Sequence, residues 1–402
     1  MSDGSVRSAA TTVQAATTTA GQTRVFVAPP PVTPRAFSCR CGRPVFFGNS
    51  RCLACGTPLG YDPASRDLLP LESAVAAECV TLQEGGTVKS LWRRADAGRD
   101  APGFWRCGNL DTAAACNWLA AKSAAPPNPA GLCICCRLTR TLPDLTVIRH
   151  PLWWNRIERA KRRLVSSLIG LDLPVQSKDE DPAQGLVFDL LRSVPNQSPV
   201  VTGHADGVIT IDVEEADDAW RERRRTELAE PYRTLLGHLR HESGHYFWLR
   251  LFEKSPWLQP FRELFGDERE DYAAALKRHY SQGAPTDWGG RFVSTYASCH
   301  PWEDWAETWA HYLHLVDTLD TAHSFGLDGE RVELTYERFS DEVLEQGDAD
   351  GQNFLQLING WMELTGVLNE LSRGMGVADF YPFVLSATVV KKLYLVHRVI
   401  TT

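Results

Sequence analysis

The chain of 402 residues carries 42 Lys and Arg against 50 Asp and Glu, which gives a formal net charge of −8. Hydrophobic residues make up 43% and charged residues 23%, the balance of an ordinary globular protein. The acidic balance argues against a protein that binds nucleic acid over its whole surface. The best candidate for a membrane span, residues 384–400, contains Lys391 and Lys392, and the N-terminus has no apolar signal segment. We therefore expect a cytoplasmic protein that does not enter a membrane.

Residues 1–35 are rich in Ala, Thr, Ser and Gln and end in a proline-rich stretch around Pro29, Pro30 and Pro31. A segment of this composition has too few large apolar side chains to form a core. The composition therefore predicts a disordered tail over residues 1–35.

Cysteine usage divides the rest of the chain, because ten of the eleven cysteines lie before residue 137. Thiols of a protein that is not secreted stay reduced, so closely spaced cysteines favour metal binding over disulfides. We predict a small Cys-rich module over residues 36–145 and a separate domain over residues 146–402.

Two matched pairs, Cys39 with Cys41 and Cys52 with Cys55, are separated by ten residues, and each pair is followed by glycine. Four thiolates complete a closed tetrahedral zinc site, which stabilises a small module. The residues between the pairs include two Arg and two Phe, which is weak support for nucleic-acid binding. We therefore expect a structural zinc site and a structural or substrate-docking role, not a nucleic-acid partner.

A second set of thiols consists of Cys107, Cys116, Cys133 and Cys136. The two intervening residues of the last pair match the usual zinc spacing, although Cys135 could replace a neighbour. We predict a second structural zinc site here. Cys79 and Cys299 have no partners by spacing and are expected to be core cysteines.

Longer segments with a regular spacing of apolar residues begin near residue 150. The pattern of apolar residues predicts a strand over 208–213 and helices over 154–169, 219–253 (interrupted or started at Pro231), 301–319, 333–344, 354–371 and 386–399.

The sharpest motif is His241-Glu242-Ser243-Gly244-His245. On a helix, positions i and i+4 share one face, so the two imidazoles can bind one zinc ion. Glu242 can lean over the same site, take a proton from the attacking water and pass it to a leaving amine. The apolar residues on both sides predict a buried helix, in which these polar side chains need partners.

A catalytic zinc site has three protein ligands, so a third is expected downstream. Glu303 and Glu307 lie one helical turn apart, and either could bind zinc while the other holds a ligand histidine by a hydrogen bond. The small residues Ala306 and Ala310 would let this helix pack closely against the first.

The pattern His241-Glu242-x-Gly244-His245 followed by Glu303-x-x-Ala306-Glu307 resembles the gluzincin metallopeptidases. The chain from about residue 37 to 400 resembles a bacterial family of zinc-binding metallopeptidases with an N-terminal zinc ribbon. Further stretches that carry this resemblance are residues 52–60, 116–118, 137–144 and 381–383. The resemblance implies that Glu303 is the third zinc ligand and that Glu307 orients a ligand from behind.

The oxyanion of a peptidase intermediate needs stabilisation besides zinc. Tyr296 resembles the tyrosine that precedes the ligand glutamate in some lethal-factor-like gluzincins, and His300 is a second candidate. The strand over 208–213 is a candidate edge to which an extended peptide substrate adds.

Together these features predict an α+β protein with a mainly helical, zincin-like metallopeptidase domain behind a zinc-ribbon module. We expect zinc as cofactor, with one catalytic ion and one or two structural ions, and a protein or peptide as substrate. Two alternatives remain: a zinc-ribbon binding or regulatory protein whose zincin domain is not catalytic, and a zinc hydrolase of a non-peptide amide. The substrate, the choice between endo- and exopeptidase and the oligomeric state are left open.

Overall fold

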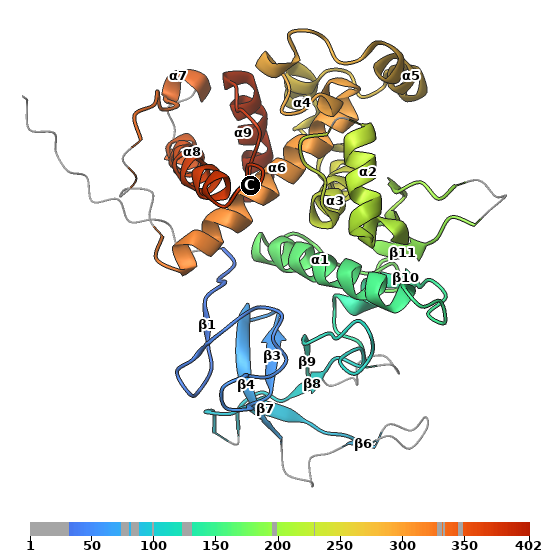
Figure 1. Cartoon of the computed structure of the whole chain (residues 1–402), viewed down its shortest axis with the longest axis vertical. Coiled ribbons are helices and arrows are strands. Elements are labelled where there is room, and N and C mark those ends of the chain that lie inside the picture. Colours follow the sequence, from blue (N-terminus) through green and yellow to red (C-terminus); the bar gives the residue numbers. More distant parts are fainter. Residues whose placement is uncertain are drawn as a thin grey trace, which may run out of the picture. The chain divides into compact units, whose positions relative to one another are not determined.

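The computed structural model of the chain describes residues 32–73, 80–81, 88–98, 100–122, 131–194, 199–228, 230–327, 332, 334–344 and 349–402 (Figure 1). The predicted tail up to residue 31 lies outside the described residues. No helix within these ranges is long and apolar enough to cross a bilayer. The architecture is mixed α/β, with short strands in the Cys-rich region and long helices after residue 150.

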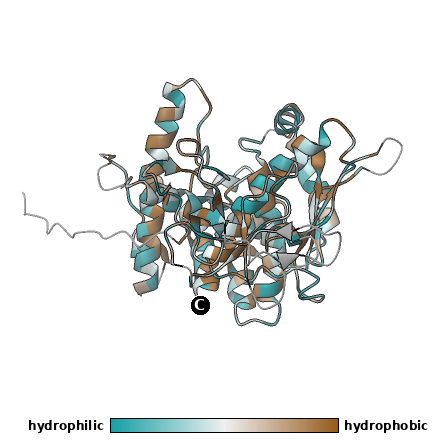
Figure 2. Cartoon of the chain, turned by 90° about the horizontal axis from the view of Figure 1, so that it is seen from below, coloured by the Kyte–Doolittle hydropathy of each residue, from teal (hydrophilic) through white to brown (hydrophobic). Residues whose placement is uncertain are grey.

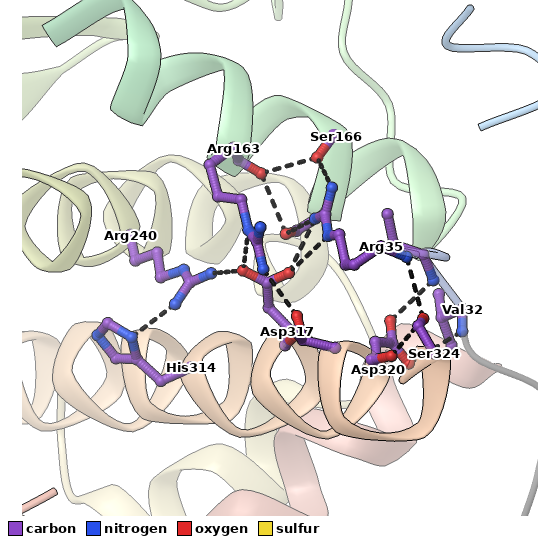
Figure 3. A network of polar contacts seen from close by, with 12 residues as sticks. Val32, Arg35, Arg163, Ser166, Arg240, His314, Asp317, Asp320 and Ser324 are labelled. Atoms are coloured by element: carbon purple, nitrogen blue, oxygen red, sulfur yellow. Dashed lines mark hydrogen bonds and ion pairs between the residues drawn. The ribbon is translucent and has the colours of Figure 1, made fainter. Parts of the chain in front are cut away.

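The last residues of the predicted tail are described, and they pack against α6 (Pro301–Ser324). The backbone amides of Val32 and Thr33 donate to the Asp320 carboxylate at 3.0 and 2.7 Å. Arg35 is buried and forms an ion pair with Asp317 at 2.8 Å, as Figure 3 shows. The predicted boundary of the tail at residue 35 is therefore too late.

From β1 to β9, the strands of the Cys-rich region are short and pair antiparallel. A two-stranded sheet joins β1 (Phe37–Ser38) and β2 (Pro44–Val45), and another joins β5 (Val80–Thr81) and β6 (Val88–Lys89). A five-stranded sheet has the order β3 (Leu59–Asp62), β4 (Asp67–Ser73), β7 (Trp92–Arg94), β8 (Phe104–Arg106) and β9 (Leu119–Ala121). Tyr61 of β3 and Trp118, which directly precedes β9, are fully buried, with ring centroids 4.9 Å apart.

A four-stranded sheet follows, in the order β10 (Thr139–Thr141), β11 (Val187–Leu191), β13 (Val208–Asp212) and β12 (Gly203–Ala205). The first three strands run parallel, and β12 joins β13 through a tight antiparallel hairpin. The predicted strand over 208–213 exists as β13, but it lies inside the sheet. The suggestion that it forms a free edge is wrong, because β12 pairs with it and takes the edge position.

The helices are α1 (His150–Gly170), α2 (Asp218–Glu227), α3 (Leu235–Phe252), α4 (Leu258–Phe265), α5 (Tyr272–Gln282), α6, α7 (Asp341–Leu344), α8 (Ala349–Gly374) and α9 (Ala387–Thr401). Figure 2 shows hydrophobic and hydrophilic residues alternating around many of these helices, the pattern of helices that bury one face.

The predicted interruption of the helical segment at Pro231 is present, and two other parts of the chain differ from the prediction. The segment 219–253 forms two helices, because the chain breaks between α2 and α3 around Pro231. Of the segment predicted as helix over 333–344, the described residues 334–340 are not helical and α7 begins at Asp341, while α4 and α5 were not predicted.

The packing of α3 against α6 sets up the centre of the second region. A Cβ atom on Gly244 would lie 2.9 Å from the Cα atom of Ala306, so only glycine permits this approach. The indole of Trp305 donates to the Gly244 carbonyl at 2.8 Å, and the indole of Trp309 donates to Ser243 Oγ at 3.1 Å. These contacts fix the two helices in register, as the small residues of the downstream segment predict.

Candidate metal centres

The two histidines of the α3 motif face each other across one turn of the helix. Thr234 caps the helix by accepting a hydrogen bond from the amide of Gly237. The Nε2 atoms of His241 and His245 lie 3.2 Å apart. Both rings are mostly buried, so the motif presents two nitrogens to one point.

Glu303 comes from the first turn of α6 and completes this group. Its Oε2 atom lies 3.0 Å from Nε2 of His241 and 3.6 Å from Nε2 of His245, yet it makes no hydrogen bond there. Tetrahedral ligands that bind one zinc ion at about 2.0–2.1 Å are about 3.3 Å from each other. The three observed separations lie around this value, so the donor set fits zinc.

Glu307 lies behind His241 and not in the ligand group. Its Oε1 atom is 2.8 Å from Nδ1 of His241, and its Oε2 atom accepts a hydrogen bond from Ser294 at 2.7 Å. A carboxylate in this position fixes the ring so that Nε2 faces the site. Glu307 therefore contacts Nδ1 of His241, while Glu303 faces Nε2 of the same ring.

The carboxylates and imidazoles shift each other's pKa. Burial disfavours the charged imidazole of His241, but its contacts with Glu303 and Glu307 outweigh burial and raise its pKa well above the ordinary value. Burial also opposes ionisation of Glu303 and Glu307, yet contact with the imidazoles lowers the pKa of both carboxyls. Both carboxyls therefore favour the ionised form.

Glu242 follows the first histidine and is buried. Its Oε2 atom has no hydrogen-bond partner in the described part of the chain. A buried carboxylate oxygen without a partner is unfavourable unless it serves a ligand, ion or reaction. Glu242 and Glu303 thus each have one buried carboxylate oxygen, Oε2, without a hydrogen-bond partner.

The tyrosine and histidine candidates for oxyanion stabilisation occupy different environments. The ring of Tyr296 is half-buried, with its centroid 6.0 Å from that of His241. His300 caps α6 by accepting a hydrogen bond from Trp302 through Nδ1, and its Nε2 contacts the carbonyl of Glu270. Both nitrogens of His300 are thus engaged.

Two residues of the site were missed by sequence reasoning. The phenol of Tyr272, the first residue of α5, donates to Oε1 of Glu303 at 2.6 Å. Burial and the Glu303 carboxylate raise the pKa of Tyr272, so its hydroxyl remains a donor. Ser294 holds Glu307. No spacing rule connects either residue with the motif, because loops bring them in from 31 and 13 positions away.

The first thiol group matches the two predicted pairs. The sulfurs of Cys39, Cys41, Cys52 and Cys55 all lie within 4.8 Å of one another. The separations of Cys39 from Cys55 and of Cys41 from Cys52 are 3.6 and 3.8 Å, close to the edge of about 3.8 Å in a zinc–thiolate tetrahedron. The glycine after each pair has a positive φ, 78° for Gly42 and 74° for Gly56, which lets the chain turn around the sulfurs.

The second thiol group contains the four predicted cysteines. The sulfurs of Cys107, Cys116, Cys133 and Cys136 lie within 4.8 Å of one another, and all four residues are buried. Cys135 is buried but outside the group, so the choice of Cys136 agrees with the structure. Cys299 is a buried free thiol, and Cys79 lies outside the described residues.

Comparison with known proteins agrees with this arrangement. Residues 150–399 match the family model described as "Putative zinc-binding metallo-peptidase", and residues 36–147 match a zinc-ribbon domain. Uncharacterized proteins of Mycobacterium bovis (strain ATCC BAA-935 / AF2122/97) and Mycobacterium tuberculosis (strain ATCC 25618 / H37Rv) are each 42% identical over 369 residues. The alignments cover 91% of this chain and 95% of each relative. No solved structure matches the chain. The chain belongs to this family of zinc-binding metallopeptidases and carries an N-terminal zinc-ribbon domain.

Proposed function

We propose that the protein is a zinc-dependent peptidase of the gluzincin type, with His241, His245 and Glu303 as zinc ligands. The observation that carries the proposal is the convergence of two Nε2 atoms and one carboxylate oxygen at zinc-ligand separations. The unpaired carboxylate of Glu242 belongs to the same motif. Zinc bound there would polarise the scissile carbonyl and make a nearby water more acidic.

Glu242 acts as general base and then as general acid. Its free Oε2 atom accepts the proton of the attacking water and delivers it to the leaving amine. A site that only stored zinc would not need a buried carboxylate without a partner at this position. This feature favours an enzyme over the alternative of a regulatory protein with an inert metal site.

Tyr296 stabilises the developing oxyanion in this scheme. Its ring lies beside His241, and burial and the Glu303 carboxylate raise its pKa, so the phenol stays protonated and can donate. Glu307 orients His241 through Nδ1.

The edge strand β12 is the proposed docking site for the peptide backbone. His204, its central residue, lies against α3, with its ring centroid 6.0 Å from that of Tyr246. Burial and the neighbouring His245 lower the pKa of His204 to about 4, so it adds no positive charge to this edge. An extended peptide that pairs with a sheet edge would run past the site, which favours a peptide over a small non-peptide amide.

The two thiol groups are proposed to hold structural zinc. Each offers four thiolates and no open position, the arrangement of ions that stabilise a fold without reacting. Because such thiolates must stay reduced, they favour action in the cytoplasm.

The decisive experiment compares wild type with Glu242→Gln on a mixture of peptides, with new termini read by mass spectrometry. We expect hydrolysis by the wild type and a loss of about 10²–10⁴-fold in the variant, because only the proton acceptor is removed. Zinc content and the thermal midpoint should be equal. Hydrolysis by Glu242→Gln at the wild-type rate would refute the assignment of Glu242. The same variant is also suited to trapping substrates from cells.

A further inference from the structure

Tyr272 contacts one carboxylate oxygen of Glu303, and the two histidines face the other. Its hydroxyl donates to Oε1 at 2.6 Å, while Oε2 faces the imidazoles of His241 and His245. Glu303 is almost completely buried, so water does not compete strongly for Oε1. The hydrogen bond from the phenol therefore holds the carboxylate with Oε1 toward Tyr272 and Oε2 toward the imidazoles.

The helix that carries Tyr272 is weakly attached to the rest of the protein. Ala275 is the only buried residue of α5. Gly266 and Gly283, which lie on either side of this segment, have φ angles of 103° and 77°, which favour glycine. Because α5 buries little apolar surface, its position depends on a few polar and aromatic contacts, and the bond to Glu303 is one of them.

A second contact connects α5 with the site. The ring centroid of His279, in the last turn of α5, lies 6.0 Å from that of Tyr296. The first and last turns of α5 therefore both approach residues of the proposed active site.

We propose that Tyr272 is a positioning residue that fixes Glu303 as a single-oxygen zinc ligand and thereby couples the order of α5 to metal occupancy. The proposal rests on the zinc site of the proposed function. Zinc binding would fix the orientation of the Glu303 carboxylate. This carboxylate accepts the hydrogen bond from Tyr272, and that hydrogen bond fixes the first turn of α5. The coupling is reciprocal, since whatever stabilises α5 in this position also strengthens zinc binding.

The first test measures zinc affinity by competition with a chelator in wild type, Tyr272→Phe and Tyr280→Phe. Tyr280 lies on the same helix, is 64% exposed and makes no hydrogen bond within the described residues. Tyr272→Phe should weaken zinc binding at the His–His–Glu site about 10–100-fold, as for other partners that support a metal ligand. Tyr280→Phe should equal wild type, and the thiolate zincs should be unchanged in both variants. Equal affinity in Tyr272→Phe and wild type would overturn the proposal.

The second test measures amide hydrogen exchange of α5 with and without zinc at this site. We expect zinc to slow exchange over residues 272–282 in wild type and Tyr280→Phe, but much less in Tyr272→Phe. Slowing of the same size in all three proteins would overturn the coupling. If wild type binds no zinc beyond the thiolate sites, the proposed function itself fails, which is a different result from normal binding that does not depend on Tyr272.

Discussion

Helices α3 and α6 carry two buried clusters of charged residues, one around Asp317 and one around Glu303. The two central carboxylates differ in how many of their oxygens accept hydrogen bonds. Around Asp317, Oδ1 accepts two hydrogen bonds from Arg35, and Oδ2 accepts one each from Arg163 and Arg240 (Figure 3). Around Glu303, Oε2 faces two imidazole nitrogens and makes no hydrogen bond. A saturated carboxylate locks a structure, whereas an unsaturated one can bind an ion.

The cluster around Asp317 joins four parts of the chain. Arg35 comes from the segment before the zinc ribbon, Arg163 from α1, Arg240 from α3 and Asp317 from α6. Arg240 directly precedes His241, so the ion pair that ties α3 to α6 lies next in sequence to the first proposed metal ligand. Both oxygens of Asp317 are paired where no reaction is proposed, whereas Oε2 of Glu303 is left without a hydrogen bond where one is proposed.

The largest effect is expected from removing the open carboxylate. Glu303→Ala leaves two imidazoles as ligands and should purify without the zinc of this site. Glu307→Ala removes only the support of His241 and should weaken zinc binding about 10–100-fold. Elemental analysis of both variants measures the difference. A loaded Glu303→Ala beside an empty Glu307→Ala would reverse the roles of the two residues.

Removing the saturated carboxylate should affect folding. Asp317→Asn leaves buried guanidiniums without their counter-charge, which should lower the free energy of unfolding by about 3–5 kcal/mol in urea titrations. Asp96→Asn is the matched control, because its ion pair with Arg94 is exposed and should contribute nothing measurable. A midpoint for Asp317→Asn equal to that of the control would show that the cluster does not stabilise the fold.

The same carboxylate should make stability depend on acid. Burial opposes ionisation of Asp317, but Arg35, Arg240 and Arg163 lower its pKa below the ordinary value. A group with a lowered pKa in the folded state stabilises above its unfolded pKa of about 3.9, and this stability falls as the pH drops below it. Unfolding followed from pH 6 to 2 should show this loss in wild type, and Asp317→Asn should show a smaller one. Parallel curves for both proteins would contradict the assignment.

A smaller effect on stability is expected at the close contact between Gly244 of α3 and Ala306 of α6. Gly244→Ala places a methyl group against the backbone of Ala306 and should lower the free energy of unfolding by about 1–3 kcal/mol. Gly360→Ala, in α8, meets nothing within 4 Å and should raise stability by about 0.5–1 kcal/mol. Urea titrations of both variants compare the two signs. Stabilisation by Gly244→Ala would show that the helices can separate without cost.

The parts of the site that follow local rules could be predicted from the sequence. Positions i and i+4 on a helix bring His241 and His245 together, and the Cys–Gly pairs turn the chain around the sulfurs. The contacts that depend on long loops could not be predicted. Tyr272 reaches Glu303 from the first residue of α5, 31 positions earlier in the chain, and no periodicity of the sequence reports such a contact.

The same limit applies to the fold. Strand character was visible in residues 208–213, but alternation does not reveal which neighbour covers an edge, and β12 is too short to give a signal. The composition of residues 32–35 matches that of the tail. Their order comes from Asp317 and Asp320, nearly 300 positions away.

The most direct test of the central claim is the zinc content of wild type and of the double variant His241→Ala/His245→Ala, measured by elemental analysis after gel filtration. If the His–His–Glu site and both thiol groups each hold one ion, wild type should contain about three zinc per chain and the double variant about two. A brief treatment with chelator should remove one zinc from wild type and none from the variant, because an open site exchanges faster than a closed thiolate cage. Equal zinc content in the two proteins would contradict the claim that this site binds zinc.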